Sequence, residues 1–216
     1  MTIELLLVRH GNTFAPGDRI VWVGKGQDLP LVPSGRAQAE TLGKSLTDAR
    51  WIPTAAVSGG LKRQVEHLAL GAPAGSPEPI RIEALDEVDY GQWGGLTTDE
   101  IHERFGPDEV TAWNERSEWP QNAGWPETEQ EVRARVQAFL SDVADGRHGE
   151  RVMACSSNGL LRWFLAAIPG ALESALEEGT FKVKTGGVGL LRFHSGDEDA
   201  QWKVALWNTR PDSLLL

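Results

Sequence analysis

Short apolar runs alternate with stretches of helical periodicity along this chain, and this alternation limits the fold more than any other feature. The runs expected to form strands are residues 3–8, 55–58, 80–82, 151–156, 188–193 and 202–206. Helical patterns occupy residues 34–49, 61–70, 97–105, 127–144, 158–168 and 171–176. Strands that alternate with helices form βαβ units, in which helices cover both faces of a parallel sheet. The sequence therefore predicts an α/β fold, a three-layer α/β/α sandwich with a mostly parallel sheet.

The two ends of this pattern add detail. The last two runs are separated by only about eight residues, including Ser195-Gly196-Asp197, which is too short for a helical crossover. They predict an antiparallel hairpin at the edge of the sheet. Near the start of the chain, Ser34 precedes a helical pattern and is the expected N-cap of that helix.

The chain of 216 residues is expected to form one domain, residues 1–216, with an insertion at about residues 86–126. Residues 106–126 contain three prolines and three tryptophans, and they interrupt the alternation of strands and helices. Long connections of this kind are often functional, so we expect the segment to cap one edge of the sheet. Ordinary surface packing of the aromatic side chains is the alternative.

Charge is distributed unevenly. The net charge is −10, and residues 99–131 hold ten acidic and two basic side chains, a local charge of −8. Nucleic acid is not an expected partner, because no basic stripe is present to offset phosphate repulsion. The acidic stretch itself is typical of a solvated helical surface.

Other whole-chain features indicate a cytoplasmic protein without membrane contact. No apolar run approaches the ~20 residues needed to span a bilayer, and the N-terminus lacks the basic region of a signal peptide. Cys155 is the single cysteine, so no disulfide can form within the chain, as is common in a reducing compartment. Oligomeric state stays open. A homodimer through the tryptophan-rich segment or the apolar tail is one option.

The first candidate catalytic residues lie at the end of the opening strand, where Arg9-His10-Gly11 follows an apolar run. Open α/β sheets place their active sites at the carboxyl edge of the strands. Arginine binds anions, and imidazole can act as a nucleophile or base near neutral pH. A buried histidine beside an exposed arginine is the alternative interpretation of this tripeptide alone.

Three later segments carry groups that suit the same edge. Residues 58–63 follow a strand and open a helix that bears Arg63, and a helix N-terminus offers N–H groups to an anion. Glu87 lies among aromatic residues, where desolvation raises the pKa of a carboxyl group. Ser157 and Asn158 form a second strand-to-helix turn. Each segment also has an ordinary structural interpretation. Arg63 would then lie on a helix surface, Glu87 in a solvated loop, and Ser157 and Asn158 would form a polar N-cap.

In this order the segments resemble the histidine phosphatase superfamily, also called the phosphoglycerate mutase-like family. Residues 9–13 (RHGNT) look like its RHG(E/Q)T signature, and residues 28–39 resemble its D-x-PLTxxGxxQA segment. Residues 58–63 are similar to SSPLxR, with Gly-Gly in place of Ser-Pro, and residues 87–95 are similar to its E-xx-(Y/F)-G-x-W-x-G segment. Residues 124–136 resemble the start of a helix usually written GES…R. The matches span about residues 3–193.

The resemblance implies a metal-independent phosphomonoesterase that needs no cofactor. By this resemblance His10 attacks phosphorus and becomes phosphohistidine, and Glu87 protonates the leaving alkoxide and then activates water. The phosphate-binding residues implied are Arg9, Thr13, Arg63, Ser157 and Asn158. The implied ligand is a small-molecule phosphate ester or inorganic phosphate.

Two positions depart from the family pattern. Ser157 stands where the family has a second histidine, so it can donate a hydrogen bond but brings no positive charge. Pro16 stands where many members have a phosphate-contacting asparagine, and proline has no N–H to donate. Arg19 or a shifted loop is a candidate replacement. These departures keep open a degenerate phosphate-binding or regulatory module with little turnover.

A phosphotransferase of the phosphoglycerate mutase type is a third interpretation. Mutases of this family carry a basic segment after the acid region, and residues 97–126 show nothing similar. If the acidic segment covers the site, it disfavours a bisphosphate. The sequence then predicts a monophosphate ester whose remainder is neutral or cationic.

Overall fold

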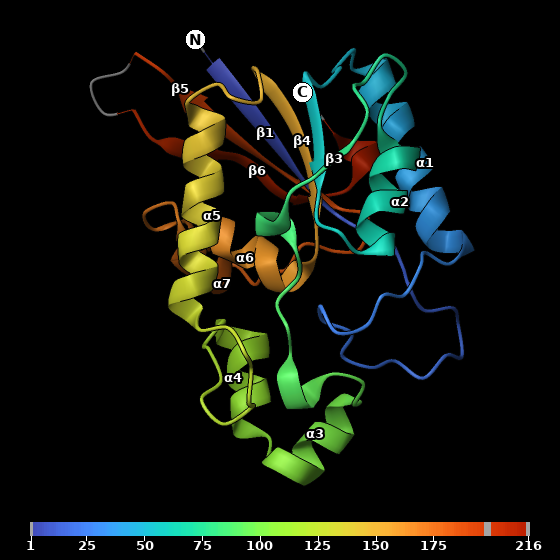
Figure 1. Ribbon diagram of the computed structural model, residues 1–216, viewed down its shortest axis with the longest axis vertical. Helices are drawn as coiled ribbons and strands as arrows, with labels where there is room; N and C mark the ends of the chain where they lie inside the picture. The colour runs from blue at the N-terminus through green and yellow to red at the C-terminus, as the bar shows by residue number, and fades with distance from the viewer. Residues whose placement is uncertain (1, 197–199, 215–216) are drawn as a thin grey trace.

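The computed structural model describes residues 2–196 and 200–214. Within them, one mixed sheet has the strand order β3-β2-β4-β1-β5-β6 (Figure 1). The strands are β1 (Thr2–Arg9), β2 (Ala55–Ser58), β3 (Ile80–Arg81), β4 (Arg151–Ser156), β5 (Val188–His194) and β6 (Trp202–Thr209). All six apolar runs predicted from the sequence form strands.

Strand direction confirms a mostly parallel sheet with an antiparallel edge. β1 pairs in parallel with β4, β4 with β2, and β2 with β3. β5 runs antiparallel to both β1 and β6, so β5 and β6 form the expected hairpin. Of its predicted turn, Asp197 lies outside the described residues. β1 therefore occupies a central position, with hydrogen-bonded strands on both sides.

Helices cover both faces of the sheet, which makes a single α/β/α domain (Figure 1). α1 (Pro33–Asp48) and α2 (Lys62–Gly71) lie on one face. α5 (Glu129–Ala144), α6 (Asn158–Ala166) and α7 (Ala171–Glu177) lie on the other. Successive side chains of a strand point to opposite faces. Leu6 of β1 accordingly belongs to the core under α1 and α2, and Leu7 belongs to the core under α5 and α6.

The segment expected to form a cap lies beyond the carboxyl ends of the parallel strands (Figure 1). It contains α3 (Thr98–Phe105) and a further helix, α4 (Asp108–Arg116). The sequence prediction missed α4, because the prolines and tryptophans of residues 106–126 suggested an irregular insertion there. The residues at its start instead suit a helix: Pro107 is the N-cap, and Asp108 and Glu109 lie in the first turn, near the positive end of the helix dipole. Trp113 anchors α4 in the core.

The expected N-cap at Ser34 is wrong. α1 begins at Pro33 with Val32 as the N-cap, since the fixed φ of proline suits the first helical position. Ser34 lies inside the first turn, where its Oγ accepts a hydrogen bond from Asn12 Nδ2 at 3.2 Å. The N-terminus of α1 therefore packs against the segment that follows β1.

Two glycines make this packing close. A Cβ atom on Gly35 would lie 2.2 Å from the carbonyl oxygen of Asn12, and one on Gly11 would lie 2.4 Å from the carbonyl oxygen of Gly35. Both distances are far below van der Waals contact, and the obstructing atoms belong to the backbone. The backbones of α1 and of the segment after β1 approach each other in a way that side chains would prevent.

We expect Gly35→Ala to destabilise the protein by about 2 kcal/mol or more, although alanine favours an open helical position by about 1 kcal/mol. Gly26→Ala is the matched control, because a Cβ there meets no atom within 4 Å. Its effect should stay within about 0.5 kcal/mol. Urea unfolding of the two variants measures the difference. A neutral Gly35→Ala would show that the close approach is not required.

Candidate active site

His10 lies directly after β1 and is buried, with 7% of its surface exposed. Its backbone N–H donates to the carbonyl of Ser156, so the pairing of β1 with β4 continues past the end of the strand. The ring Nδ1 lies 2.8 Å from the carbonyl oxygen of Gly11, and Nε2 lies 3.1 Å from Nε of Arg63. A carbonyl only accepts and an arginine N–H only donates, so we assign the proton to Nδ1 and a free lone pair to Nε2.

The electrostatic surroundings keep His10 neutral. Burial, and then the charges of Arg63 and Arg9, hold the pKa of the imidazole well below its usual value. The ring is therefore unprotonated at neutral pH. An unprotonated imidazole with a directed lone pair is the form that can attack phosphorus.

Two arginines flank this imidazole, the buried Arg63 and the half-buried Arg9. Arg63 lies in the first turn of α2, and its terminal nitrogens donate to the carbonyls of Gln27 at 2.8 Å and Gly24 at 2.7 Å. Arg9 donates from Nη1 to the carbonyl of Val183 at 2.6 Å, and its buried Nε has no partner in the described part of the chain. A guanidinium has five N–H groups, so both arginines keep donors for an anion.

Glu87 is held at the N-terminus of α6. One carboxylate oxygen accepts from the N–H groups of Val88 and Leu160, both at 2.9 Å, and the other accepts from Gly159 at 3.2 Å. The Tyr90 hydroxyl lies 3.5 Å from the second oxygen. These contacts fix a buried carboxylate beside the turn that contains Ser157, and its charge raises the pKa of both Arg9 and Arg63 against the effect of burial.

Ser157 and Asn158 occupy the turn between β4 and α6. Ser157 is buried, and its Oγ accepts from Nε2 of Gln64 at 3.0 Å, which leaves its own hydroxyl proton for another acceptor. The buried Oδ1 of Asn158 has no partner among the described residues. Sequence reasoning missed Gln64, a fully buried amide next to Arg63. Its signal is a polar residue at a core-facing position of an amphipathic helix.

The remaining predictions concern the loop that follows His10. Thr13 is half-buried in this loop, and the structure joins it by no hydrogen bond to the other predicted site residues it describes. Pro16 is exposed. Arg19 does not replace the missing donor, because it is exposed and pairs with Glu100 of the cap. The structure thus gathers Arg9, His10, Arg63, Glu87 and Ser157 at one edge and pairs Arg19 with the cap, while a role for Thr13 stays a prediction.

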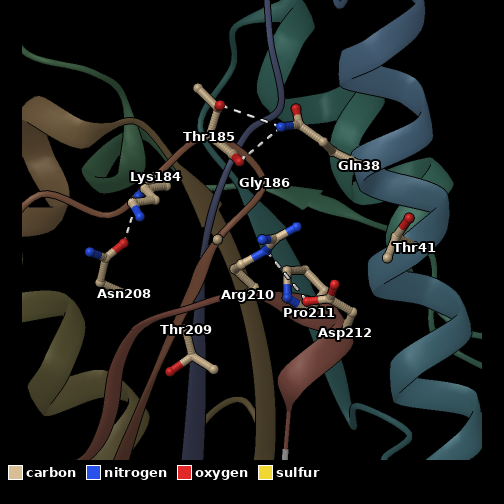
Figure 2. Close-up of a pocket in the computed structure, with 11 residues that line it drawn as sticks. Gln38, Thr41, Lys184, Thr185, Gly186, Asn208, Thr209, Arg210, Pro211 and Asp212 are labelled. Atoms are coloured by element: carbon tan, nitrogen blue, oxygen red, sulfur yellow. Dashed lines mark hydrogen bonds and ion pairs between the residues drawn. The ribbon is translucent and has the colours of Figure 1, made fainter.

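Behind the loop, Gln38 of α1 bridges two segments: its Oε1 accepts from the N–H of Asn12 at 2.8 Å, and its Nε2 donates to the carbonyl of Thr185 at 3.0 Å. Figure 2 shows Gln38 at the rim of a cavity of about 210 Å³, with Lys184, Asn208 and Arg210 around it. This cavity lies between α1 and residues 184–187 and 208–212, and none of the predicted site residues lines it.

In residues 2–196 and 200–214, no group of three or more His, Cys, Asp or Glu side chains is arranged to hold a metal ion. None of the helices in this part of the chain is long and apolar enough to span a membrane.

A family model, the histidine phosphatase superfamily (branch 1), matches residues 5–210. The chain belongs to this superfamily. Among curated relatives, a 2,3-bisphosphoglycerate-dependent phosphoglycerate mutase of Brucella anthropi is 28% identical over 180 residues, which cover 79% of this chain and 83% of the relative. The enzyme of the same name from Rhizobium etli is 32% identical over 139 residues, or 63% and 65% of the two chains.

Solved structures of the superfamily share the fold. A mycobacterial glucosyl-3-phosphoglycerate phosphatase superposes with a TM-score of 0.76 at 23% identity, over 97% of this chain and all of the other. An alpha-ribazole phosphatase of Shigella flexneri gives a TM-score of 0.74 at 21% identity, over 96% and 97%. At these identities the likeness concerns the fold.

One more residue close to His10 was not predicted from the sequence. His67 of α2 is fully buried, and its Nδ1 accepts from the N–H of Gly11 at 3.0 Å. Its Nε2 has no partner in the described residues. Burial lowers the pKa of His67 to about 4. The neutral ring therefore helps hold the backbone directly after His10.

We expect His67 to make the protein sensitive to acid. Its pKa is about 4 when folded and 6.5 otherwise, so the unfolded chain binds the proton first as the pH falls. The contribution is intact above pH 6.5 and decreases toward pH 4, by about 2.5 kcal/mol at about pH 4.5. His67→Gln keeps an acceptor for Gly11 and should reduce the acid-induced loss of unfolding free energy by that amount.

Urea unfolding at several pH values tests this expectation. His102→Gln, on the half-exposed surface of α3, is the matched control and should keep the pH dependence of the parent protein. Equal pH dependence in the parent protein and His67→Gln would contradict the role assigned to His67.

Proposed function

We propose that the protein is a phosphomonoesterase that transfers a phosphoryl group to Nε2 of His10 and then to water, without a metal ion. The observation that carries the proposal is the buried, neutral His10, whose Nε2 lone pair lies 3.1 Å from Arg63 Nε. A binding site for phosphate alone requires the arginines, but it has no need for an unprotonated nucleophile beside a buried carboxylate.

In the first step, Nε2 of His10 forms a bond to phosphorus while the bond from phosphorus to the ester oxygen breaks. The Nε–H of Arg63 leaves the lone pair and donates to a phosphate oxygen, as does the unpartnered Nε–H of Arg9. Glu87 passes a proton to the leaving alkoxide and regains one from water in the second step. The products are the free alcohol and N-phosphohistidine.

In the second step, Glu87 accepts a proton from water, and the oxygen of that water attacks the phosphohistidine. The N–P bond breaks, and inorganic phosphate and the neutral imidazole are released. The guanidinium groups of the buried Arg63 and the half-buried Arg9 stabilise the oxygen charges throughout, because partial exclusion of water strengthens such interactions. The neutral Ser157 contributes one hydroxyl donor at the position where the family has a second histidine, which would bring a further positive charge.

A mutase reaction is the second candidate, since curated relatives bear that name. Hydrolysis is favoured here because the acidic stretch of residues 99–131 has only Arg104 and Arg116 as basic residues, and both are exposed. Product analysis separates the two reactions: a mutase moves the phosphoryl group to a second alcohol, whereas a phosphatase releases it as inorganic phosphate.

We expect the parent protein to release phosphate from an aryl phosphate without added metal, and His10→Ala to lower the rate by at least about 10³-fold, since it removes the nucleophile. A colorimetric phosphate assay over about pH 5–8 measures both proteins. Denaturing gels after incubation with labelled ester should show acid-labile label on the parent protein alone. Absence of turnover in both proteins would favour a phosphate-binding module.

We expect Ser157→Ala to lower kcat by about 10–100-fold, because it deletes one donor to the phosphate and removes one of the two acceptors of Gln64 Nε2. Ser156→Ala is the neighbouring control. Its hydroxyl donates to the Leu85 carbonyl at 2.7 Å, away from the phosphate, so it should affect stability more than kcat. Steady-state kinetics with thermal unfolding separates the two effects. Equal kcat values would remove Ser157 from the site.

A further inference from the structure

Asp86 is a buried carboxylate directly before Glu87, and the proposed reaction gives it no role. Only 3% of its surface is exposed. Its Oδ1 accepts a hydrogen bond from the backbone N–H of Gly60 at 2.7 Å, and its Oδ2 lies 3.3 Å from Nζ of Lys25 and 3.6 Å from Nη2 of Arg81. Burial of a carboxylate is costly unless partners satisfy it, and each of these three partners belongs to a different segment around the site.

The contact with Gly60 fixes the start of α2. Gly60 lies two residues before this helix, which begins at Lys62 and carries Arg63 in its first turn. The sequence pattern of the family has proline at this position, and a proline would have no N–H to offer Asp86. A hydrogen bond from a backbone N–H to a carboxylate is charge-assisted and therefore strong. Asp86 thus joins the segment that bears Glu87 to the helix that bears Arg63.

Lys25 brings the loop that follows β1 into the same network. Its backbone N–H donates to the carbonyl of Val88 at 3.0 Å and its ammonium group pairs with Asp86, so it contacts the residues on both sides of Glu87. The two carbonyls of this loop that hold Arg63 belong to residues 24 and 27, on either side of Lys25 in the chain. The loop therefore links the surroundings of the carboxylate to those of the guanidinium.

Other contacts hold the segment around Glu87 from β4 and α5. Ser156 Oγ donates to the carbonyl of Leu85 at 2.7 Å, and Arg135 Nη1 donates to the carbonyl of Asp86 at 2.7 Å. Toward α2, the described part of the chain has the hydrogen bond of the Asp86 carboxylate and a longer one, 3.4 Å, from residue 64 to the carbonyl of Leu85. The Asp86 carboxylate therefore provides the shorter of the two links to α2.

The hydrogen bond to Gly60 is the main contact of the three. The side chains of Lys25 and Arg81 are 42% and 66% exposed, and ion pairs with such exposed cations contribute little to stability. The N–H of Gly60, by contrast, is part of the backbone just before α2 and cannot turn away into solvent without moving the chain.

We propose that Asp86 is a positioning residue: by binding the N–H of Gly60, it holds the carboxyl group of Glu87 at a fixed separation from the guanidinium of Arg63. The inference rests on the proposed phosphatase function, in which Glu87 passes a proton to the leaving oxygen while Arg63 binds the phosphate. Both groups act on the same ester, so their separation has to match the P–O bond that breaks. A shift of about 1 Å in one of them lowers a rate by about 100-fold.

The test compares phenyl phosphate with 4-nitrophenyl phosphate, which have similar shapes but different leaving groups. Phenoxide is the stronger base, so its departure depends more on the proton from Glu87. Because kcat/KM covers the reaction up to the formation of phosphohistidine, the ratio of kcat/KM for the two esters reports proton delivery. A general loss of structure or of phosphate binding affects both esters equally and leaves this ratio unchanged.

We expect Asp86→Ala to lower kcat/KM by about 10–100-fold for phenyl phosphate and by less than about threefold for 4-nitrophenyl phosphate. Asp86→Asn keeps an acceptor for Gly60 and should restore the parent ratio. The matched control is Asp28→Ala: Asp28 Oδ1 accepts from the N–H of Lys62 at 2.6 Å, also at the start of α2, so both esters should lose the same factor. Equal losses for both esters in Asp86→Ala would overturn the proposal.

Variants of Gly60 test the hydrogen bond from its other end. Gly60→Pro removes the N–H and should change the ratio as Asp86→Ala does, and the double variant should show no further change. Gly60→Ala keeps the N–H and should keep the parent ratio; its Cβ would lie 2.2 Å from Nε of Arg81, an exposed side chain that can turn into solvent. Thermal unfolding shows whether each variant is folded. A parent ratio in folded Gly60→Pro would contradict the role of this bond.

If the parent protein hydrolyses neither ester, the proposed function fails, and crystal structures of the parent protein and Asp86→Ala then test the positioning alone. We expect the separation between the Glu87 carboxyl group and the Arg63 guanidinium to change by about 1 Å or more, the size of shift that impairs catalysis. An unchanged separation would overturn the role of Asp86 whether or not the protein has activity.

Discussion

The central strand β1 is the constraint on which the other contacts of the site depend. It is hydrogen-bonded to β4 on one side and to β5 on the other, and its inner residues are fully buried. Arg9 and His10 leave the sheet at its carboxyl end, and their carbonyl oxygens accept from the N–H of Gly186. A strand fixed on both sides holds these groups more firmly than a loop could, because register and side-chain direction are set by the sheet.

Much of the fold was predictable because the strands are short apolar runs separated by clear turn signals. The helix α4 was not, since its start resembles a loop until the burial of Trp113 is known. The N-cap predicted at Ser34 was wrong because Pro33, the residue before it, already begins the helix. Local sequence describes propensity, while the choice between competing starts depends on what each helix packs against.

The candidate site likewise contains residues that the sequence predicts and residues that only the packing reveals. Arg9, His10, Arg63 and Glu87 stand in segments whose pattern indicates chemistry. Gln64 and His67 are ordinary helix residues in the sequence, and only the packing of α2 against the ends of β1 and β4 joins them to Ser157 and Gly11. The last two leucines of the apolar tail lie outside the described residues, so a homodimer through that tail stays a prediction.

The loop between His10 and α1 connects two parts of the molecule mechanically. It supplies the carbonyls of Gly24 and Gln27 to Arg63, and its Trp22 exchanges backbone hydrogen bonds with Gly95 and Leu96 at the start of the cap. A displacement of the cap therefore pulls on the ligands of the guanidinium beside His10. The cap and Arg63 are therefore coupled through this loop. A molecule that displaces the cap as it binds also changes the contacts that hold the Arg63 guanidinium.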